Sequence, residues 1–421
     1  MPDVAVSVDT IKRFYLFLAV FYYCGYMGFF TRFVAGKAEG SIESTADGNI
    51  IKQALGVAIL LIGALLLLYT NREKALFFIK KNMLWLALIA FFIVSISWSD
   101  VEAVSIRRLI ALLSLIICCL VIAVHFEIRS VLIYFSEVFF YAAILGLVMV
   151  VVAPDIALAD QSGAGRGNTF FGIYFDKNGG ARCYAYALLI RIGLGLINTK
   201  TDLFKILTLF VCLVFANSAT AIVMLVLGLS VILALNNLHS VNQKSNLKRL
   251  LSVMLLALLG SIVINVAYEF ILTMLGRDPT LTNRVIIWEL LTPYIEDKWL
   301  LGYGFGAFWA SSSAEDFVDR WGFIGNAHSG YYEAMLNGGI ICLAIVVFLI
   351  IKIIKDCLVI YVTDKNGTII TPIIAIIVIQ TIVNYIGYIV LNFNGADMFL
   401  FTTFAFLATH RLYESGSYRL P

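Results

Sequence analysis

The sequence predicts an all-α protein that crosses a membrane many times and carries one large polar loop late in the chain. Hydrophobic residues make up 61% of the 421 residues and charged residues only 14%, whereas a water-soluble domain carries about 25% charged residues. Apolar stretches of roughly 20 residues recur, and each can cross about 30 Å of hydrocarbon as a helix. The net charge of +3 gives no indication of nucleic acid as a partner. We therefore expect a single polytopic membrane domain over residues 1–421.

The hydropathy pattern predicts about twelve transmembrane helices. The first follows Lys12 and Arg13 and lacks a small-residue cleavage site, which favours a span over a removed signal peptide. In chain order the predicted spans are 14–33, 51–70, 83–97, 109–126, 131–153, 180–198, 203–218, 219–236, 250–274, 335–354, 369–391 and 397–413. The large polar loop, 275–334, lies between the ninth and tenth spans.

Basic residues in the loops predict which side of the membrane each loop faces. They cluster before the first span and in alternate loops after it, so the positive-inside rule makes these loops and both termini cytoplasmic. The residues concerned are Lys12, Arg13, Arg72, Lys74, Lys80, Lys81, Lys244, Lys248, Arg249, Lys352, Lys355 and Lys365. The external segments are then 34–50, 97–108, 154–179, 217–220 and 275–334.

Several cations lie on the external side, against this bias. They are Arg107, Arg108, Arg166, Lys177, Arg182, Arg277 and Arg284. Cations kept on the disfavoured side indicate an anionic ligand, and contact with lipid headgroups is the alternative for any single one. Three charges fall inside apolar spans: Glu137, Arg191 and Glu269. Arg191 is close enough to the cytoplasmic end of its helix to snorkel there.

His328 is the one histidine that this topology places outside. It stands in Ala-His-Ser-Gly-Tyr-Tyr-Glu, where the large loop re-enters the membrane. Histidine suits proton abstraction from a hydroxyl near neutral pH, although a helix-capping role is the alternative. Tyr332 follows at i+4 and shares its helix face, whereas Glu333 points elsewhere, so no His–Glu dyad is implied. His125, His239 and His410 lie at cytoplasmic positions and fit interfacial anchoring.

Arg284 is expected at the first turn of a helix that Thr282 or Asn283 caps. A guanidinium there faces an unfavourable helix dipole unless an anion lies beside it. Trp288, one turn later on the same face, offers a stacking surface to a sugar or lipid. The forked guanidinium group of arginine can donate paired hydrogen bonds to phosphate oxygens. Arg277 is a further candidate, with Asp278 as its alternative partner.

The segment Gly302–Trp309 alternates glycine with aromatic residues. It lacks the strand and the lysine of a P-loop, so we expect a tight loop that presents aromatic side chains at the bilayer surface. Metal binding is not indicated. The seven cysteines show no ligand spacing and fit small apolar residues, and one external histidine with scattered acids makes no closed ligand set. No cofactor is expected.

Six motifs occur in an order that resembles the O-antigen ligase/polymerase superfamily of bacterial membrane glycosyltransferases, and within it the exopolysaccharide polymerases. They are Ser-Trp-Ser-Asp with Ser-Ile-Arg-Arg, Phe-Asp-Lys-Asn, Asn-Ser-Ala-Thr-Ala, Gly-Arg-Asp-Pro-Thr-Leu-Thr-Asn-Arg with its following Trp, Gly-Tyr-Gly-Phe-Gly-Ala-Phe-Trp, and Ala-His-Ser-Gly-Tyr. Together they cover roughly residues 95 to 345.

The resemblance implies a glycosyltransferase of the GT-C type in the bacterial inner membrane, with its active site facing the periplasm. Donor and acceptor would be oligosaccharides on undecaprenyl diphosphate, and a chain-length regulator is a candidate partner. By position, Arg284 would bind the donor diphosphate and His328 would act near the acceptor hydroxyl. Arg277, Arg182 and Lys177 would add positive charge, with Arg107 and Arg108 as further contributors. Trp288 and Tyr332 would contact substrate.

The chain departs from the family pattern at two places. Asn283 stands where glycine often precedes the arginine, a mild change because asparagine tolerates the left-handed conformation. Where ligases tend to have an arginine after the serine, this chain has Ser218-Ala219-Thr220, which favours a polymerase. Transfer of the glycan to lipid A core or to protein, as a ligase, is the second hypothesis. A non-catalytic transporter is the third, although the spans offer few paired charges for a polar pathway.

Overall fold

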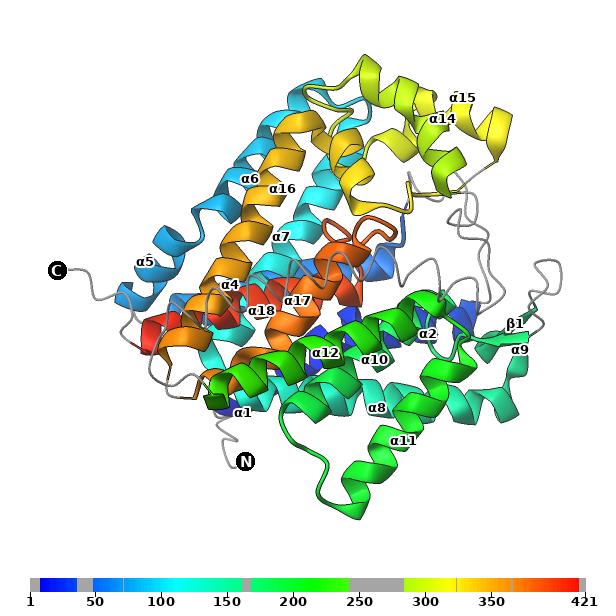
Figure 1. The fold of residues 1–421 in the computed structure, drawn as a ribbon. Coiled ribbons are helices and arrows are strands. Elements are labelled where there is room, and N and C mark those ends of the chain that lie inside the picture. Colours follow the sequence, from blue (N-terminus) through cyan, green and yellow to red (C-terminus); the bar gives the residue numbers. More distant parts are fainter. Residues whose placement is uncertain are drawn as a thin grey trace, which may run out of the picture.

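The computed structural model describes residues 8–35, 48–70, 72–160, 168–241, 284–322, 324–364 and 366–415, and most of these are helical (Figure 1). The first half holds α1 (Val8–Tyr23), α2 (Tyr26–Ala35), α4 (Ile50–Leu68), α5 (Arg72–Lys81), α6 (Met83–Ser95), α7 (Glu102–His125), α8 (Ile128–Val152) and α9 (Pro154–Ala157). Strands β1 (Leu158–Asp160) and β2 (Asn168–Phe170) then form a small antiparallel ribbon.

The second half of the chain continues with helices that carry most of the predicted site. They are α10 (Lys177–Gly193), α11 (Lys200–Phe215), α12 (Ala219–Val241), α14 (Arg284–Asp297), α15 (Ser312–Trp321), α16 (Gly330–Thr363), α17 (Thr371–Val383) and α18 (Ala396–Glu414). Short 3₁₀ turns occupy Ile96–Trp98, Phe308–Ala310 and Gly367–Ile370.

Within the described ranges, five helices are long and apolar enough to cross a membrane, namely α4, α7, α8, α12 and α16. The number rises to seven if the bent pairs α1–α2 (60°) and α5–α6 (71°) each count as one span. The multi-pass all-α class is therefore confirmed. Each predicted span except 250–274 overlaps a helix, and 250–274 lies outside the described residues. The total of twelve stays a prediction.

Each of the two bends has a residue that contacts a distant part of the chain. Gly25, between α1 and α2, has φ +97°, and a Cβ there would lie 2.8 Å from the Tyr174 ring. Only glycine accepts both this conformation and this approach. Between α5 and α6, the buried Asn82 side chain donates to the carbonyl of Phe78 at 2.9 Å and accepts from Lys352 Nζ at 3.3 Å. These contacts hold the Asn82 side chain at the break and give both ends of its amide a partner.

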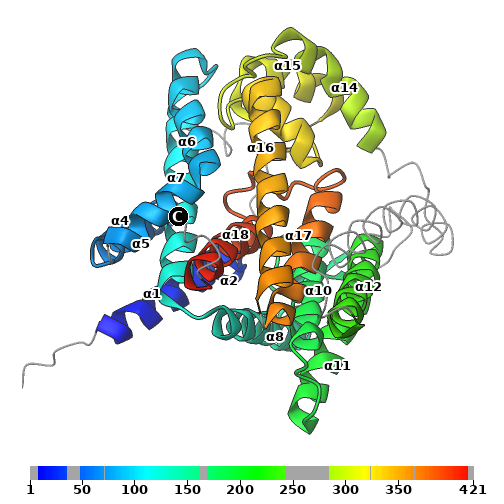
Figure 2. The same cartoon turned by 60° about the vertical axis from the view of Figure 1, so that its left-hand side comes forward.

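Helices α16, α17 and α18 lie between the α4–α7 group and the α8–α12 group (Figure 2). Nearly every side chain of α18 from Asp397 to Leu412 is buried, and α10 and α17 are similarly covered. A helix that is buried on all sides needs no polar face, which explains the continuous apolar run of α17. The interior helices fix the positions of the segments that start or end at the external side.

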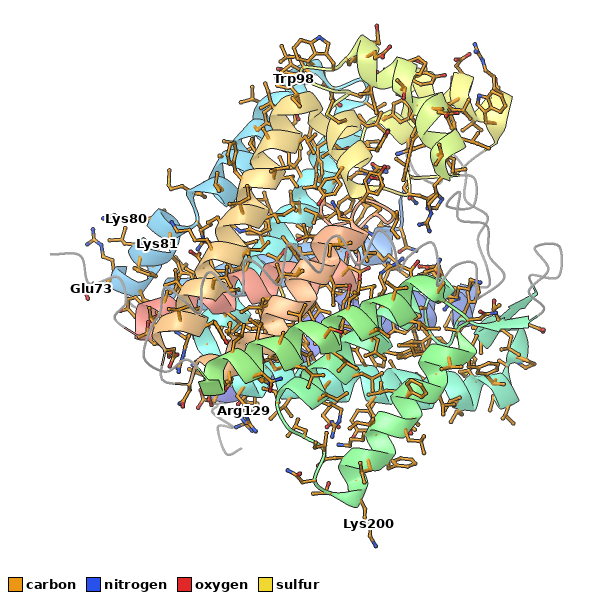
Figure 3. All side chains as sticks on the ribbon, in the orientation of Figure 1. Glu73, Lys80, Lys81, Trp98, Arg129 and Lys200 are labelled. Carbon is orange, nitrogen blue, oxygen red and sulfur yellow. The ribbon has the colours of Figure 1, made fainter. Side chains whose placement is uncertain are left out.

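Trp98, from a predicted external segment, lies far from several basic residues of the predicted cytoplasmic segments. Trp98 lies at the end that carries α14 and α15, whereas Lys80, Lys81, Arg129 and Lys200 lie toward the other end (Figure 3). Which side of a membrane either end faces stays a prediction from the basic residues. The candidate site residues can therefore be sought at one end.

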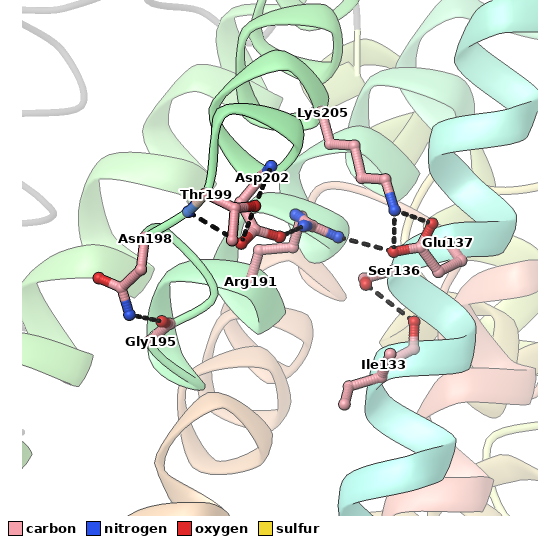
Figure 4. Close-up of polar contacts among 9 residues, drawn as sticks. All are labelled: Ile133, Ser136, Glu137, Arg191, Gly195, Asn198, Thr199, Asp202 and Lys205. Atoms are coloured by element: carbon pink, nitrogen blue, oxygen red, sulfur yellow. Dashed lines mark hydrogen bonds and ion pairs between the residues drawn. The ribbon is translucent and has the colours of Figure 1, made fainter.

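A cluster of ion pairs joins α8, α10 and α11 near the other end (Figure 4). The Arg191 guanidinium, whose side chain is 1% exposed, binds Glu137 at 2.9 Å and also Asp202. Lys205 binds Glu137 at 2.6 Å, and Asp202 closes a capping box with Thr199. The expectation that Arg191 snorkels to the membrane surface is wrong, because two carboxylates from neighbouring helices satisfy its charge inside the protein.

Candidate functional site

His328 stands on a short segment that two helices hold in place. The backbone carbonyl of Ala327, the residue before it, accepts a hydrogen bond from Trp288 Nε1 on α14 at 2.9 Å. The N–H of Ala327 donates to Glu333 Oε1 on α16 at 2.6 Å. The residue after His328 is Ser329, and this serine is the N-cap of α16. The helix-capping role therefore belongs to Ser329 and leaves the imidazole available for other contacts.

The backbone of His328 adopts φ +49°, in the left-handed region. Such a conformation costs a non-glycine residue on the order of 1–3 kcal/mol and is concentrated at functional sites. Its own N–H donates to Asn326 Oδ1 at 2.9 Å. The contacts to the preceding Ala327 stabilise the same turn, so the surrounding structure holds His328 in a geometry that the free chain would avoid.

Arg284 and Asp176 are the charges that act on His328. Burial is the main cause that lowers the pKa of this histidine, and the Arg284 charge lowers that pKa further. The Asp176 charge opposes both and raises it. His328 is consequently neutral at pH 7 and able to accept a proton. The structure thus brings together two predicted residues, His328 and Arg284, and adds Asp176 from the start of α10.

Trp288 lies within an aromatic stack. Its ring is 5.2 Å from that of Tyr332 at an interplanar angle of 16°, and 5.0 Å from that of Tyr385. Arg284 and Trp288 lie one turn apart on α14, as predicted. Trp288 is 4% exposed, so in this structure its ring supports the His328 segment, and little of it is open to a substrate.

The Arg182 guanidinium is already bound by a carboxylate. It makes hydrogen bonds with both oxygens of Asp397 on α18, at 2.6–3.1 Å, and Tyr186 donates to the same carboxylate at 2.7 Å. The neighbouring Lys177 is 4% exposed. Ser218 donates to Asn178 Oδ1 at 2.9 Å, which joins the Asn217–Thr220 turn to the start of α10. The paired charge of Arg182 attracts an anion less strongly than a lone guanidinium would.

A cavity of about 230 Å³ opens beside these residues. Its lining includes Lys52, Asp176, Arg182 and Asp397, with Tyr22 among the aromatic members. Three helix N-termini reach it, those of α4, α10 and α18. The N-terminal ends of helices favour anions because their backbone N–H groups lack helical partners. The N-cap of α18, Gly395, supplies no side-chain cap. Asp176 belongs to this cavity and also acts on His328.

Arg108 and the Gly302–Trp309 segment contact each other. Arg108 Nη1 donates to the carbonyl of Gly306 at 2.6 Å, and the amide oxygen of Asn337 on α16 accepts from the Gly306 N–H at 2.6 Å. The expectation that this segment presents aromatic side chains at the bilayer surface is wrong. Tyr303, Phe305, Phe308 and Trp309 are all 2% exposed or less, because the loop folds inward between α7 and α16.

The other predicted site residues are less informative. Arg277 lies outside the described residues, as do the proposed caps Thr282 and Asn283. Arg107 lies at the external start of α7, near the segment that leads into α4, since a Cβ on Gly48 would be 3.3 Å from its Nε. The seven cysteines are all free and buried, as expected for small apolar side chains.

A family model matches part of the chain. Residues 204–347 match the family model described as O-Antigen ligase. This match covers about a third of the chain and supports the resemblance to the O-antigen ligase/polymerase superfamily. No curated protein matches the chain at a significant level. The matched region contains Arg284 and His328, whereas Lys52, Asp176 and Asp397 lie outside it.

Four residues of the candidate site are missing from the sequence-based prediction: Lys52, Asp176, Glu333 and Asp397. Lys52 and Asp397 stand at the ends of predicted spans, where a charge is ordinary. Asp176 was visible as a charge in the Phe-Asp-Lys-Asn motif, yet its sign is opposite to the one sought. Glu333 contacts the backbone before His328 and not the imidazole, and helical spacing does not reveal such a contact.

Proposed function

We propose that the chain is a membrane glycosyltransferase that polymerises undecaprenyl-diphosphate-linked oligosaccharide repeat units at the periplasmic face. The reaction inverts the anomeric centre and uses no metal ion. The observation that carries this proposal is the setting of His328, a neutral histidine held in a left-handed turn next to Arg284. A base and a permanent cation side by side suit attack by a hydroxyl on a carbon that bears a phosphate leaving group.

The cavity between the N-termini of α4, α10 and α18 supports a binding place for the donor diphosphate. Its volume of about 230 Å³ equals that of about seven water molecules in the liquid, which suits one diphosphate or one sugar. Lys52 and the uncapped N-terminus of α18 supply positive potential. Asp176 lines the cavity and also acts on His328, on which Arg284 acts in turn. The polyprenyl tail would then extend into the lipid.

The chemical step transfers the growing glycan to a hydroxyl of the next lipid-linked unit. His328 accepts the hydroxyl proton on an imidazole nitrogen while the oxygen attacks the anomeric carbon. The bond from that carbon to the diphosphate oxygen breaks, and undecaprenyl diphosphate leaves with the electron pair. Attack from the side opposite the leaving group accounts for inversion. Arg284 stabilises the charge that develops on the departing diphosphate, in surroundings that screen it little.

Reconstitution with lipid-linked repeat units tests this proposal. We expect polymer from the wild type and none, or at least about 100-fold less, from His328→Ala and Arg284→Ala. Arg129→Ala removes an exposed arginine at the opposite end of the molecule and serves as the control. Undiminished polymer from His328→Ala would rule the mechanism out. The linkage in the product, read by NMR, checks inversion.

Ligation is the second candidate, because the matching family model is described as O-Antigen ligase. Offering lipid A core in place of a second repeat unit separates the two activities. Product on lipid A core and none on the repeat unit would favour ligation. Assays in detergent, without sealed vesicles, also separate either enzyme from a transporter, since a transporter forms no glycosidic bond.

A further inference from the structure

An open groove lies between α14 and α15, away from the cavity near α4. Its volume is about 670 Å³, which corresponds to about twenty water molecules in the liquid. It therefore has room for several linked sugars. The lining residues are Glu289, Leu290, Pro293, Tyr294, Asp297, Tyr303, Ser312, Ser313, Asp316, Arg320 and Trp321.

The aromatic residues of the groove combine a rigid floor with one open ring. The Tyr303 hydroxyl donates to the carbonyl of Tyr294 at 2.8 Å, and the Tyr294 hydroxyl donates to Asp316 at 2.7 Å. Buried Phe308 lies edge-on to both tyrosine rings, which supports them from beneath. Trp321, in contrast, is 58% exposed. A fixed aromatic surface with an open face suits stacking against the apolar face of a sugar ring.

The charge of the groove restricts what it can bind. Glu289, Asp297 and Asp316 contribute three carboxylates, and the one cation in the lining, Arg320, is bound to Asp316 at 2.7 Å. Carboxylates accept hydrogen bonds from sugar hydroxyl groups. They also repel a polyanion, because like charges across an interface raise the free energy of binding. The lining therefore favours a neutral or amino-sugar chain over one rich in uronic acid.

The groove follows the helix that begins at Arg284. Glu289 lies five residues along α14 and Asp297 thirteen, which places them about 7.5 Å and 20 Å from Arg284 at 1.5 Å per residue. Glu289 and Asp297 also lie about 140° and 220° around the helix from Arg284, so a glycan whose first sugar is held at Arg284 and His328 would reach the groove by passing round α14 with its more distant sugars.

We propose that this groove binds the growing saccharide chain of the donor, and that the chain is neutral or carries amino sugars. This inference rests on the proposed polymerase function. A chain held at several sugars dissociates more slowly between transfers, so the groove would set the length of the polymer. The coupling of two single repeat units does not require it.

The test compares two exposed tryptophans of the same loop. Trp321→Ala removes the open ring of the groove, whereas Trp299→Ala removes a ring that is 57% exposed but does not line it. We expect Trp321→Ala to shorten the polymer markedly on gels while the coupling of two single units keeps its wild-type rate. Trp299→Ala should leave both unchanged. Glu289→Gln, at an exposed position in the groove, is a second variant and should also shorten the polymer.

Binding provides an independent measurement. Short oligomers cut from the wild-type polymer and freed of lipid should bind Trp321→Ala about three- to tenfold more weakly than wild type in calorimetric titration. Unchanged polymer length and unchanged affinity in both groove variants would overturn the inference. If the groove variants also lost the coupling of two single repeat units, the groove would be assigned to the acceptor, and this result would also overturn the inference. If the wild type makes no polymer, the proposed function fails instead.

Discussion

Glu333 Oε1 accepts a hydrogen bond from the backbone N–H of Ala327 at 2.6 Å, one residue before His328. The same oxygen accepts from Trp309 Nε1 at 2.9 Å. Glu333 therefore acts as a positioning residue that joins the loop containing His328 to α16. It touches neither the imidazole nor the cavity beside α4, so any effect of Glu333 on the reaction must pass through the backbone.

Replacing Glu333 should separate positioning from charge. Glu333→Gln keeps an oxygen that can accept both hydrogen bonds, whereas Glu333→Ala leaves two buried donors without a partner. We expect Glu333→Ala to lower kcat on the order of 100-fold, since small displacements of a reacting group have effects of this size. The KM for the lipid-linked donor should change little, because the donor cavity is untouched.

The stability of the two Glu333 variants provides the control. Each unpaired buried donor costs about 1–3 kcal/mol, which thermal unfolding in detergent would detect in Glu333→Ala. Glu333→Gln should stay near wild type in both stability and kcat. An inactive Glu333→Gln protein with wild-type stability would show that the carboxylate charge itself is needed.

The pH dependence of the reaction should follow His328. Its pKa is lowered from 6.5, mainly by burial and then by the Arg284 charge. The neutral, active form therefore predominates above pH 6.5 and is lost as the pH falls through the lowered pKa. Asp176 raises this pKa, so Asp176→Asn should lower it further and move the acid limb of kcat/KM to lower pH.

A matched control distinguishes this electrostatic effect from a general one. Asparagine at 176 can still cap α10, so the fold should be preserved. Asp155→Asn removes another exposed external carboxylate and should leave the pH profile unchanged. An acid limb that moves to higher pH in Asp176→Asn would contradict the assignment of His328 as the base.

Lys52 should affect donor binding more than the chemical step. It lines the cavity between the helix N-termini, with its Nζ 5.1 Å from the centre of the Phe175 ring. We expect Lys52→Gln to raise the KM for the lipid-linked donor about tenfold. The reason is that the variant loses one charge-assisted hydrogen bond to the donor, which contributes about 1.5 kcal/mol to binding. The kcat should fall much less. Initial rates over a range of donor concentrations measure both, and an unchanged KM would remove Lys52 from the donor site.

Gly306 should tolerate no side chain, because a Cβ there would clash with a neighbouring side chain. Gly195, which has a similar backbone conformation and no such neighbour, serves as the control. Gly306 and Gly195 have nearly equal φ values, +69° and +70°. A Cβ on Gly306 would lie 2.2 Å from Cδ of Arg108, whereas one on Gly195 would meet nothing within 4 Å. Both alanine variants lose about 1–2 kcal/mol from the left-handed conformation. Gly306→Ala should lose about 1–3 kcal/mol more from overpacking, measured by thermal unfolding. Equal losses would contradict this.

The long apolar helices were the most predictable part of the fold, because their hydrophobic composition alone indicates them. α4, α7 and α8 are long apolar segments, and such a segment has one low-energy solution in a bilayer. The placement of Arg284 and Trp288 on one helix was also predictable from local sequence. The breaks at Gly25 and Asn82 were not, because each depends on contacts with a distant residue, Tyr174 or Lys352.

The site was only partly predictable, because its charges meet across long sequence separations. Asp397 lies 215 residues from Arg182, and no spacing rule indicates that the two form a pair. The aromatic residues around Gly306 show another limit. Glycine alternating with aromatic residues suits both a membrane-surface loop and a buried turn, and the deciding contacts come from Arg108 and Asn337.

The ion pairs at the two ends of α10 together prevent this helix from sliding along its axis or rotating about it. Arg182 binds Asp397 on α18, and Arg191 binds Glu137 on α8 and Asp202 at the start of α11. Nine residues separate the two arginines, which is 2.5 turns, so they project from opposite faces of the helix. Sliding or rotating α10 by a single residue would break both sets of contacts at once. The position of Asp176 at the start of α10 is thereby set from both sides of the helix, and so is the position of this exposed carboxylate relative to His328.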